Sequence, residues 1–309
     1  MAKSSHSYSA STKQPAYPVL ILDVQADPNL PQNFHTTKNA YPKSAENPPT
    51  RQGLDDLNAS GSGQFTGGNL KKMLKDSNIK NVYVVDLRKE FHGFLDNIPV
   101  SWYGFNNLEN KDSVASTVAT SEKRLLYTLG TQRKATVYQK KSENGREYFT
   151  PRNITFKEVR TEDELVNGST DYQYLRLYVL DHNPPDNSQI DGFVKFVKSM
   201  QTPAWLHVHC DAGEGRTTTF LAMYDMIRNA NHVSLDDILK RQNLIGGTDL
   251  MVTQGVEEWK LPLMKQRYEL LQNFYEYVKD PEGYEKRSFS DWQRYKAKAK
   301  KSRFSIFGL

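Results

Sequence analysis

Cysteine is nearly absent from this chain of 309 residues, and Cys210 is its one example. A single thiol excludes an internal disulfide framework but leaves the compartment open, because a reactive thiol works on either side of a membrane. Long apolar runs are also missing, so the sequence predicts no membrane-spanning helix. The apolar stretch at 19–23 is too short and too late for a secretory signal. Either the protein is not exported by that route, or the sequence begins after a removed signal.

Charge of one sign is only mildly in excess. The chain carries 41 Lys and Arg residues against 36 Asp and Glu, a formal net charge of +5 that favours anionic ligands. It shows no basic stripe with interleaved aromatic residues and no known nucleic-acid motif, so we expect no nucleic-acid partner. Hydrophobic residues make up 37%, with 17 Tyr and 14 Phe, enough for one large domain or for a core with a smaller domain.

The most informative segment surrounds the cysteine, where residues 209–217 read His-Cys-Asp-Ala-Gly-Glu-Gly-Arg-Thr. Alternation over 204–209 predicts a buried strand before it, and apolar positions between 217 and 229 predict a helix after it. A strand, a loop and a helix N-terminus direct backbone N–H groups and the helix dipole at one bound anion. Gly213 and Gly215 allow the loop to turn with its amides facing inward.

This segment can activate Cys210 as a nucleophile for phosphorus. Arg216 can bind two phosphate oxygens at once, and with the helix N-terminus it favours the thiolate form of the cysteine. Thr217 or Thr218 can donate a hydrogen bond to the sulfur and help it to leave, although either residue also suits the start of a helix.

Two other interpretations of the segment are a buried, apolar cysteine and a metal site formed by His207, His209 and Cys210. Three clustered ligands without a second cluster make a poor zinc site. Neither interpretation explains the two glycines and the arginine that follow, so the sequence favours a phosphatase.

A thiolate that cleaves a phosphate ester expels a poor leaving group, so a carboxylic acid must protonate that group and then activate water. Asp181 is the best candidate, because it follows a predicted strand at 172–180 and opens a loop that two prolines stiffen. It could equally be an ordinary turn aspartate. Asp186 and Asp191 are weaker candidates, since Asp191 is expected to face solvent early in the next helix.

The chain divides by composition into three parts. Residues 1–68, rich in Ser, Pro, Asn, Gly and Gln, predict an irregular arm; 69–279 form the core; and 280–309 form a basic tail. Strands alternate with helices in the core, which predicts an α/β sheet with helices on both faces. The predicted helices are 69–77, 113–129, 161–166, 190–200, 217–229, 234–245 and 263–278. The predicted strands are 81–86, 172–180 and 204–209, with a hairpin from 136–138 and 148–150 around Asn144–Gly145.

Two blocks of the sequence resemble one known family. The first is the segment 209–217, and the second, more specific block reads Asp-Leu-Arg-Lys-Glu-Phe-His-Gly-Phe from 86 and Ile-Pro-Val-Ser-Trp-Tyr-Gly from 98. Further matches lie at 181–182, 241–242, 245–247 and 259–260. From about Leu30 to about Val278 the chain resembles the bacterial protein-tyrosine-phosphatase-like inositol phosphatases, or cysteine phytases.

The resemblance implies a tyrosine-phosphatase-like core, a central sheet flanked by helices, with a small partial β-barrel inserted near residues 135–160. It implies stepwise removal of phosphates from myo-inositol hexakisphosphate and lower inositol polyphosphates through a phosphocysteine, without a metal or cofactor. It also suggests a secreted or periplasmic protein, with the cytoplasm as the alternative.

By position in the family, Cys210 is the nucleophile, Arg216 binds phosphate and Asp181 is the general acid, with Thr217 and His209 in the same catalytic set. Each lysine among the expected substrate contacts could equally be a solvated surface charge. Those contacts are Asp211, Ala212, Gly213, Glu214, Gly215, His182, Lys260, Arg267, His35, Lys140 and Lys141.

Four positions depart from the family pattern. His35 stands where relatives carry arginine, so it offers charge only when protonated. Asn107 replaces a carboxylate, and Met264 occupies a position where tyrosine can occur. Glu214 puts an acid in the phosphate-binding loop, and we expect its side chain to point outward. These changes leave the chemistry intact but affect which inositol phosphates are preferred.

Three other functions remain open. A phosphatase for phosphotyrosine or phosphoinositide lipids would use the same chemistry. An inactive inositol-phosphate-binding module would need neither the Cys210 thiolate nor the Asp181 acid, so the presence of both argues against it. A membrane-associated effector would use the basic tail, although such tails are more often solvated helix faces. The tail's cations are Lys296, Lys298, Lys300, Lys301 and Arg303.

Overall fold

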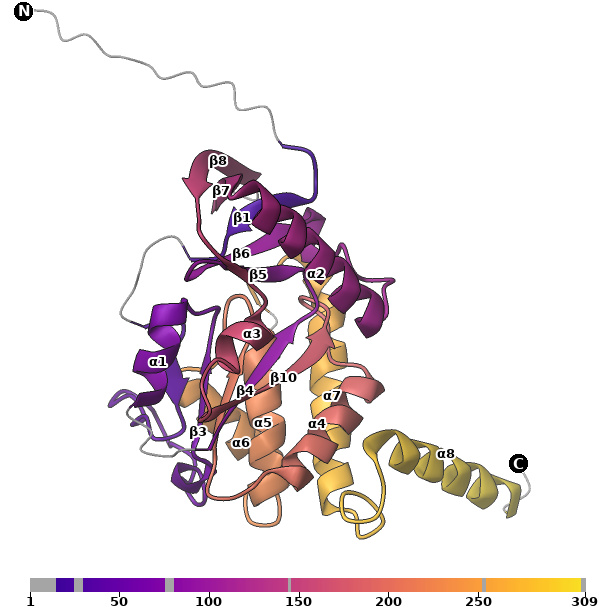
Figure 1. The fold of residues 1–309 in the computed structure, drawn as a ribbon. Helices are drawn as coiled ribbons and strands as arrows, with labels where there is room; N and C mark the ends of the chain where they lie inside the picture. The colour runs from indigo at the N-terminus through magenta and orange to yellow at the C-terminus, as the bar shows by residue number, and fades with distance from the viewer. Residues whose placement is uncertain (1–14, 25–29, 76–80, 144–145, 252–253, 307–309) are drawn as a thin grey trace, which may run out of the picture.

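Two β-sheets and the helices that cover them form the body of the protein (Figure 1). The computed structural model describes residues 15–24, 30–75, 81–143, 146–251 and 254–306. A five-stranded sheet lies in the lower part of Figure 1, and a six-stranded sheet with the long helix α2 lies above it.

The five-stranded sheet has the order β10-β4-β11-β3-β2. The first four strands are parallel to one another, and β2 pairs with β3 in the antiparallel direction. The central strands β4 and β11 are buried along their whole length, as expected for a parallel sheet covered on both faces. The strands are β10 (Tyr172–Val179), β4 (Val82–Arg88), β11 (Trp205–His209), β3 (Ala59–Ser62) and β2 (His35–Thr36).

Helices cover both faces of this sheet, which confirms the predicted α/β class. Successive side chains of β4 point to opposite faces. Val82 and Val84 pack in a cluster with α1 (Gly67–Lys75) and α3 (Glu162–Val166). Tyr83 and Val85 belong to the larger core formed with the other helices. These are α4 (Asn187–Ser199), α5 (Gly215–Asn229), α6 (Leu235–Leu244) and α7 (Leu261–Lys279).

The six-stranded sheet has the order β8-β7-β1-β6-β5-β9. Only β7, β8 and β9 come from the insert predicted near residues 135–160; the other three strands precede it in the chain. A partial barrel stays a prediction, since β8 and β9 stand at the two ends of the order. Leu129 of α2 (Ala115–Gln132) packs against the apolar cluster of this sheet. The strands are β8 (Arg146–Thr155), β7 (Lys134–Glu143), β1 (Val19–Leu22), β6 (Ile98–Tyr103), β5 (His92–Leu95) and β9 (Val159–Arg160).

The predicted irregular arm over residues 1–68 needs correction where the structure describes it. β1 joins the six-stranded sheet, and β3 lies beside β11 in the five-stranded sheet. β3 has the sequence Ala-Ser-Gly-Ser, whose small residues give no apolar alternation. They are needed because α5 passes close by: a Cβ on Gly61 would lie 2.8 Å from Leu221 and Thr217 side-chain carbons. Residues 1–14 and 25–29 lie outside the described residues.

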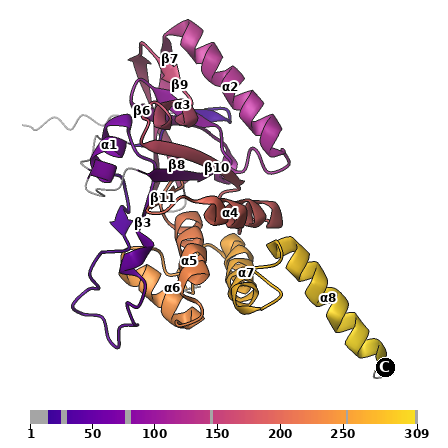
Figure 2. The same cartoon turned by 60° about the horizontal axis from the view of Figure 1, so that its bottom comes forward.

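The predicted basic tail contains α8 (Phe289–Ile306), which extends away from the body (Figures 1 and 2). Its first turn is anchored, because Phe289 and Trp292 are buried against Phe274 and Tyr277 of α7. Three short 3₁₀ helices complete the described elements: Asp55–Leu57, Phe105–Asn107 and Glu258–Lys260. Among the described helices, none combines the length and the apolar character that a membrane span requires.

Candidate active site

Cys210 lies at the carboxyl end of β11, at the start of the loop that leads into α5. Its sulfur accepts hydrogen bonds from the backbone N–H of Gly213 and from the Thr217 hydroxyl, both at 3.3 Å. Gly213 has a φ of +76°, and a Cβ there would lie 2.2 Å from the nitrogen of Gly63. The loop therefore requires glycine at 213 in order to turn its amide toward the sulfur.

Arg216 is the buried cation of this loop. Glu90 binds it through both carboxylate oxygens, with Oε2 2.8 Å from Nη1 and Oε1 2.9 Å from Nη2. Its Nη1 also donates to the backbone carbonyl of Val179 at 3.1 Å. The Arg216 Nε is buried without a hydrogen-bond partner in the described part of the protein. Glu90 thus fixes the guanidinium plane beside the loop and leaves one N–H available for an anion.

Asp181 follows β10 and contacts Arg216 within the pocket that the loop also lines. Its Oδ1 lies 3.1 Å from Nη2 of Arg216, and its Oδ2 accepts a hydrogen bond of 3.0 Å from the Asn107 side chain. Burial raises the pKa of Asp181, but Arg216, together with His182 and the hydrogen bond from Asn107, outweighs burial, and the pKa is lowered from its ordinary value.

The two weaker acid candidates are engaged elsewhere. Asp186 caps the N-terminus of α4 and accepts hydrogen bonds from the backbone N–H groups of Ser188 and Gln189. Asp191 accepts hydrogen bonds from the backbone N–H and the hydroxyl of Ser290 near the start of α8, instead of facing solvent alone. Of the three aspartates considered, Asp181 is the one that lines the pocket with Cys210.

Cys210 and Asp181 open into one pocket of about 410 Å³. Most of the sequence-predicted contacts line it, including Glu214, which was expected to point outward. Its lining residues are Tyr103, Asn107, Lys140, Asp181, His182, Cys210, Asp211, Ala212, Glu214, Gly215, Arg216, Thr248, Val256, Lys260, Met264 and Arg267. A second hollow of about 920 Å³ shares Tyr103, Lys140, His182 and Lys260 with the first, so the site widens toward the six-stranded sheet.

Five predicted site residues are absent from this lining. Gly213 and Thr217 contact the Cys210 sulfur instead, and the other three are His35, Lys141 and His209. His35 is buried, its Nδ1 is 2.8 Å from the carbonyl of Asn33, and burial lowers its pKa, so it offers no charge to a ligand. Lys141 is exposed on the face of β7 opposite Lys140, because successive strand residues alternate. His209 is wholly buried, and its Nε2 lies 2.6 Å from Glu162. His209 can therefore position the loop but does not reach a ligand.

Sequence reasoning missed residues that hold the site together. Glu90 and Tyr103 belong to the family-like block at 86–104, but nothing in the sequence links Glu90 to Arg216. Thr248 and Val256 line the pocket from a stretch without a distinguishing motif. Arg88 is fully buried and binds Asp23 at 2.8 Å and Glu90 at 2.9 Å, so it links β4 of one sheet to the end of β1 in the other.

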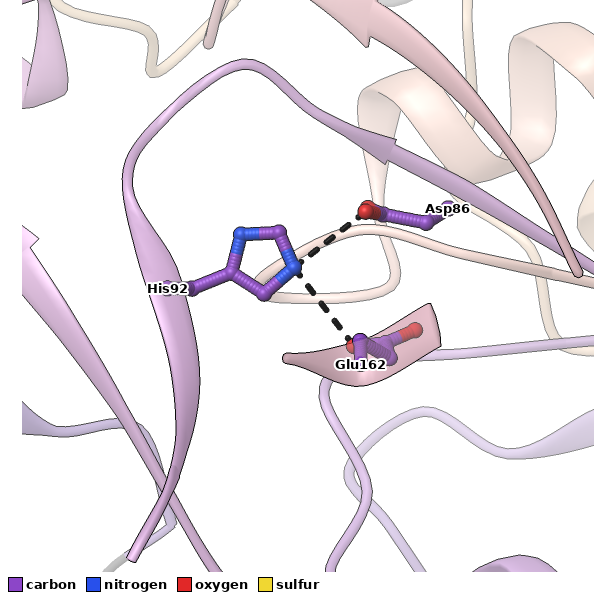
Figure 3. Close-up of side chains that lie close together, drawn as sticks. All are labelled: Asp86, His92 and Glu162. Carbon is purple, nitrogen blue, oxygen red and sulfur yellow. Dashed lines mark ion pairs between the residues drawn. The ribbon is translucent and has the colours of Figure 1, made fainter. Parts of the chain in front are cut away.

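A second buried charge cluster lies next to the site (Figure 3). Nε2 of His92 is 3.2 Å from Asp86 and 3.5 Å from Glu162, and the three side chains have the atom types of a metal site. Burial lowers the pKa of His92, but the surrounding carboxylates, Asp86 foremost and Glu122 after it, together outweigh burial, and the pKa is raised to about 10. Arg176 lies 3.2 Å from the same carboxylate. The imidazolium and the guanidinium already supply the positive charge that a metal would bring.

The sequence matches known proteins over this region and beyond it. A model of the protein-tyrosine-phosphatase-like phytase family matches residues 85–228. The description of that family names inositol hexakisphosphate. A structure of the PTP-like phytase from Bdellovibrio bacteriovorus is 32% identical, with a TM-score of 0.70, over 91% of this chain and 96% of that one.

Two further relatives are longer than this chain. The PTP-like myo-inositol phosphatase from Mitsuokella multacida, solved with myo-inositol-(1,3,4,5)-tetrakisphosphate, is 34% identical with a TM-score of 0.85, over 92% of this chain and 49% of that one. The effector protein hopD2 of Pseudomonas syringae pv. tomato is 27% identical over 254 residues, 80% of this chain and 53% of hopD2. The chain thus spans about half the length of these two relatives.

Members of this family are phosphatases that hydrolyse phosphomonoesters. The near-complete match to the Bdellovibrio phytase, together with the family match across β4, Asp181 and the Cys210 loop, shows that this chain belongs to the protein-tyrosine-phosphatase-like phytase family.

Proposed function

We propose that this protein is a cysteine-dependent phosphatase that removes phosphates from inositol polyphosphates. The observation that carries the proposal is the meeting of Cys210, Arg216 and Asp181 in one pocket, where two hydrogen bonds of 3.3 Å reach the sulfur. A binding module has no use for a stabilised thiolate opposite a carboxyl group, so this set favours catalysis. Family membership supports the substrate class.

In the first step, the Cys210 thiolate attacks phosphorus, an S–P bond forms and the P–O bond to the inositol breaks. The proton of Asp181 passes to the leaving oxygen, which departs as an alcohol. Arg216 and the backbone N–H groups of the loop hold the phosphoryl oxygens while charge redistributes among them. Thr217 stabilises the sulfur through its hydroxyl.

In the second step, water attacks the phosphocysteine, and the S–P bond breaks to give inorganic phosphate. Asp181, now ionised, takes a proton from that water, and the Cys210 thiolate is regenerated. The enzyme returns to its starting state without any cofactor entering the balance. Repeated cycles on one inositol would remove its phosphates stepwise.

Asp181 must be protonated to act as the acid, yet Arg216 lowers its pKa in the structure without ligand. A bound phosphate dianion resolves this conflict, because it takes the attraction of Arg216 for itself and repels the carboxylate. Both effects raise the pKa of Asp181 once substrate is present. Substrate binding thereby prepares the acid for the first step.

The rest of the pocket suits a substrate with several phosphates. Lys140, Lys260 and Arg267 line it in addition to Arg216. Arg267 is held by a hydrogen bond of 2.8 Å from Nη2 to the carbonyl of His182, and its buried Nε lacks a hydrogen-bond partner among the described residues. These cations offer contacts for phosphates that are not reacting.

The deciding experiment is phosphate release from myo-inositol hexakisphosphate, with a chelator present, by the wild type and by Cys210→Ser. We expect release by the wild type and a loss of at least about a thousandfold in the variant, which should still fold and bind phosphate. Full activity of Cys210→Ser would refute the mechanism. Failure of the wild type on every inositol phosphate, with turnover of a phosphopeptide or a phosphoinositide, would refute the substrate class.

A further inference from the structure

Two acids, Asp211 and Glu214, line the pocket from within the loop that binds the reacting phosphate. The Asp211 side chain is 29% exposed, whereas Glu214 lies at the open rim. An ionised carboxylate repels a phosphate but accepts a hydrogen bond from a hydroxyl. Because solvent screens Glu214 more strongly, Asp211 has the larger influence on what stands next to the reacting phosphate.

Asp211 is poorly compensated by positive charge. Its nearest cation is Nη2 of Arg88, at 3.7 Å, and that nitrogen has no hydrogen-bond partner among the described side chains. Arg88 is already bound by Asp23 at 2.8 Å and by Glu90 at 2.9 Å. Glu90 in turn holds Arg216, whose other carboxylate partner is Asp181. Three acids from three elements thus lie near Asp211: Asp23 after β1, Asp181 after β10 and Glu90 after β4.

These neighbours determine the pKa of the Asp211 carboxyl group. Burial raises its pKa; Arg88 opposes that effect; and Asp23, Glu90 and Asp181 add to it, so the pKa is raised to about 6. The side chain is therefore a neutral acid in mildly acidic solution and a carboxylate at neutral pH.

We propose that Asp211 determines which neighbour of the reacting phosphate the pocket accepts: a free hydroxyl when Asp211 is ionised, and a second phosphate when it is protonated. This inference rests on the proposed function and narrows its substrate class. At neutral pH the pocket favours partly phosphorylated inositols, and in mildly acidic solution it also accepts the fully phosphorylated ring. A protonated carboxyl group can donate its hydrogen to a neighbouring phosphate oxygen.

The test compares kcat/KM for myo-inositol hexakisphosphate with kcat/KM for myo-inositol-(1,3,4,5)-tetrakisphosphate, which keeps free ring hydroxyls, between pH 5 and 8. In the wild type we expect the ratio of the first to the second to fall by about tenfold as Asp211 ionises near pH 6. In Asp211→Asn, which has the same shape without the charge, the ratio should stay near its acidic value. Ionisation of the substrates is common to both proteins and cancels in the comparison.

Glu214→Gln is the matched control, because it removes a charge from the same loop at the exposed rim. It should leave the pH at which the ratio changes where it is in the wild type. Asp23→Asn supplies a second variant should Asp211→Asn fail to fold. It removes one acid beside Asp211 and frees Arg88, so it should move the transition to lower pH.

A wild-type ratio that does not change with pH, or a change that persists in Asp211→Asn, would overturn the inference while leaving the phosphatase function standing. An unmoved transition in Asp23→Asn would also contradict it. Absence of phosphate release from both substrates at every pH would instead overturn the proposed function, and this inference with it.

Discussion

At the scale of single residues, the site depends on how two carboxylates share Arg216. Glu90 binds the guanidinium with two hydrogen bonds from a fully buried position, whereas Asp181 makes one contact of 3.1 Å from the pocket side. A bidentate buried partner is harder to displace than a single contact. An incoming phosphate should therefore replace Asp181 and leave Glu90 in place, which keeps Arg216 oriented throughout the reaction.

Replacement of Asp181 by Asn tests its role as the acid. Asn cannot supply a proton, so hydrolysis of an inositol phosphate should slow by about 10²- to 10⁴-fold. Hydrolysis of an aryl phosphate should slow much less, because a phenolate leaves without protonation. The measurement is kcat for both substrates in both proteins.

Asp186→Asn is the matched control for that experiment. Asp186 caps α4, and Asn serves nearly as well at an N-cap, so neither stability nor activity should change appreciably. Equal losses on alkyl and aryl substrates in Asp181→Asn would argue against protonation of the leaving group by this residue.

Residue-scale prediction from sequence reached the groups in the local motif and, through the family resemblance, distant residues such as Asp181 and Arg267. Cys210, Gly213, Arg216 and Thr217 lie within eight positions, and the structure brings them together as the spacing indicated. Glu90 was not predicted as a partner of Arg216, because the contact depends on β4 and β11 lying side by side. Long-range pairing leaves no signal in a single sequence.

At the scale of elements, β7 presents two adjacent lysines to opposite sides. Lys140 lines the pocket, lies 3.9 Å from Glu147 and stands over the Tyr103 ring at 3.7 Å, whereas Lys141 points to the other face. The two side chains carry the same charge at nearly the same place in the chain. Replacing each lysine in turn therefore distinguishes a local contact with the substrate from a general effect of positive charge.

We predict that Lys140→Ala raises KM for myo-inositol hexakisphosphate by about tenfold with little change in kcat, since a contact to a non-reacting phosphate contributes equally to the ground state and the transition state. Lys141→Ala should change KM by less than about twofold, because an exposed charge is screened. Steady-state kinetics of both variants at one ionic strength checks this. Equal increases in KM would mean that only net charge matters.

Elements with strong periodicity or clear caps were predictable, and small or polar ones were not. The capping box at Thr161 and Glu164 begins α3 as expected, and the predicted strand at 172–180 is β10 at 172–179. β3 was missed because its burial comes from the close approach of α5, not from apolar side chains of its own. Its neighbours, and not its own sequence, make it a strand.

At the scale of the whole molecule, buried ion pairs hold the two sheets together. Arg88 of β4 binds Asp23, which follows β1, and His92 of β5 contacts Asp86 of β4 (Figure 3). Glu162 at the start of α3 contacts both His92 and His209, so the loop that follows β11 rests on the same network. Removing one member of a buried pair costs far more than an exposed pair contributes, because the partner stays buried and unpaired.

Because of this arrangement, the free energy of unfolding depends on pH, and in alkaline solution His92 controls that dependence. Its pKa is about 10 in the folded protein against about 6.5 in an unfolded chain, so the folded state holds the proton more tightly. The stabilisation is complete below about pH 6.5 and is lost as the pH rises toward 10, with a slope of up to about 1.4 kcal/mol per pH unit. Glu162 makes stability depend on pH on the acid side. Its pKa is lowered to about 2, mainly by His209 acting against burial, so its contribution to stability is lost as the pH falls.

The free energy of unfolding, measured in urea from pH 6 to 10, should therefore fall steeply in the wild type and less steeply in His92→Asn. The variant will be less stable throughout, because Asp86 and Glu162 lose a buried cation, so the comparison concerns the two slopes and not the absolute stabilities. Tyrosine and lysine residues also titrate in this range, but they do so in both proteins and cancel in the difference. Parallel slopes would mean that His92 is neutral in the fold and that Arg176 balances Asp86 without it. A steeper wild-type slope would show that the charged imidazolium of His92, in its contact between β5 and β4, stabilises the fold alongside the ion pair of Arg88 and Asp23.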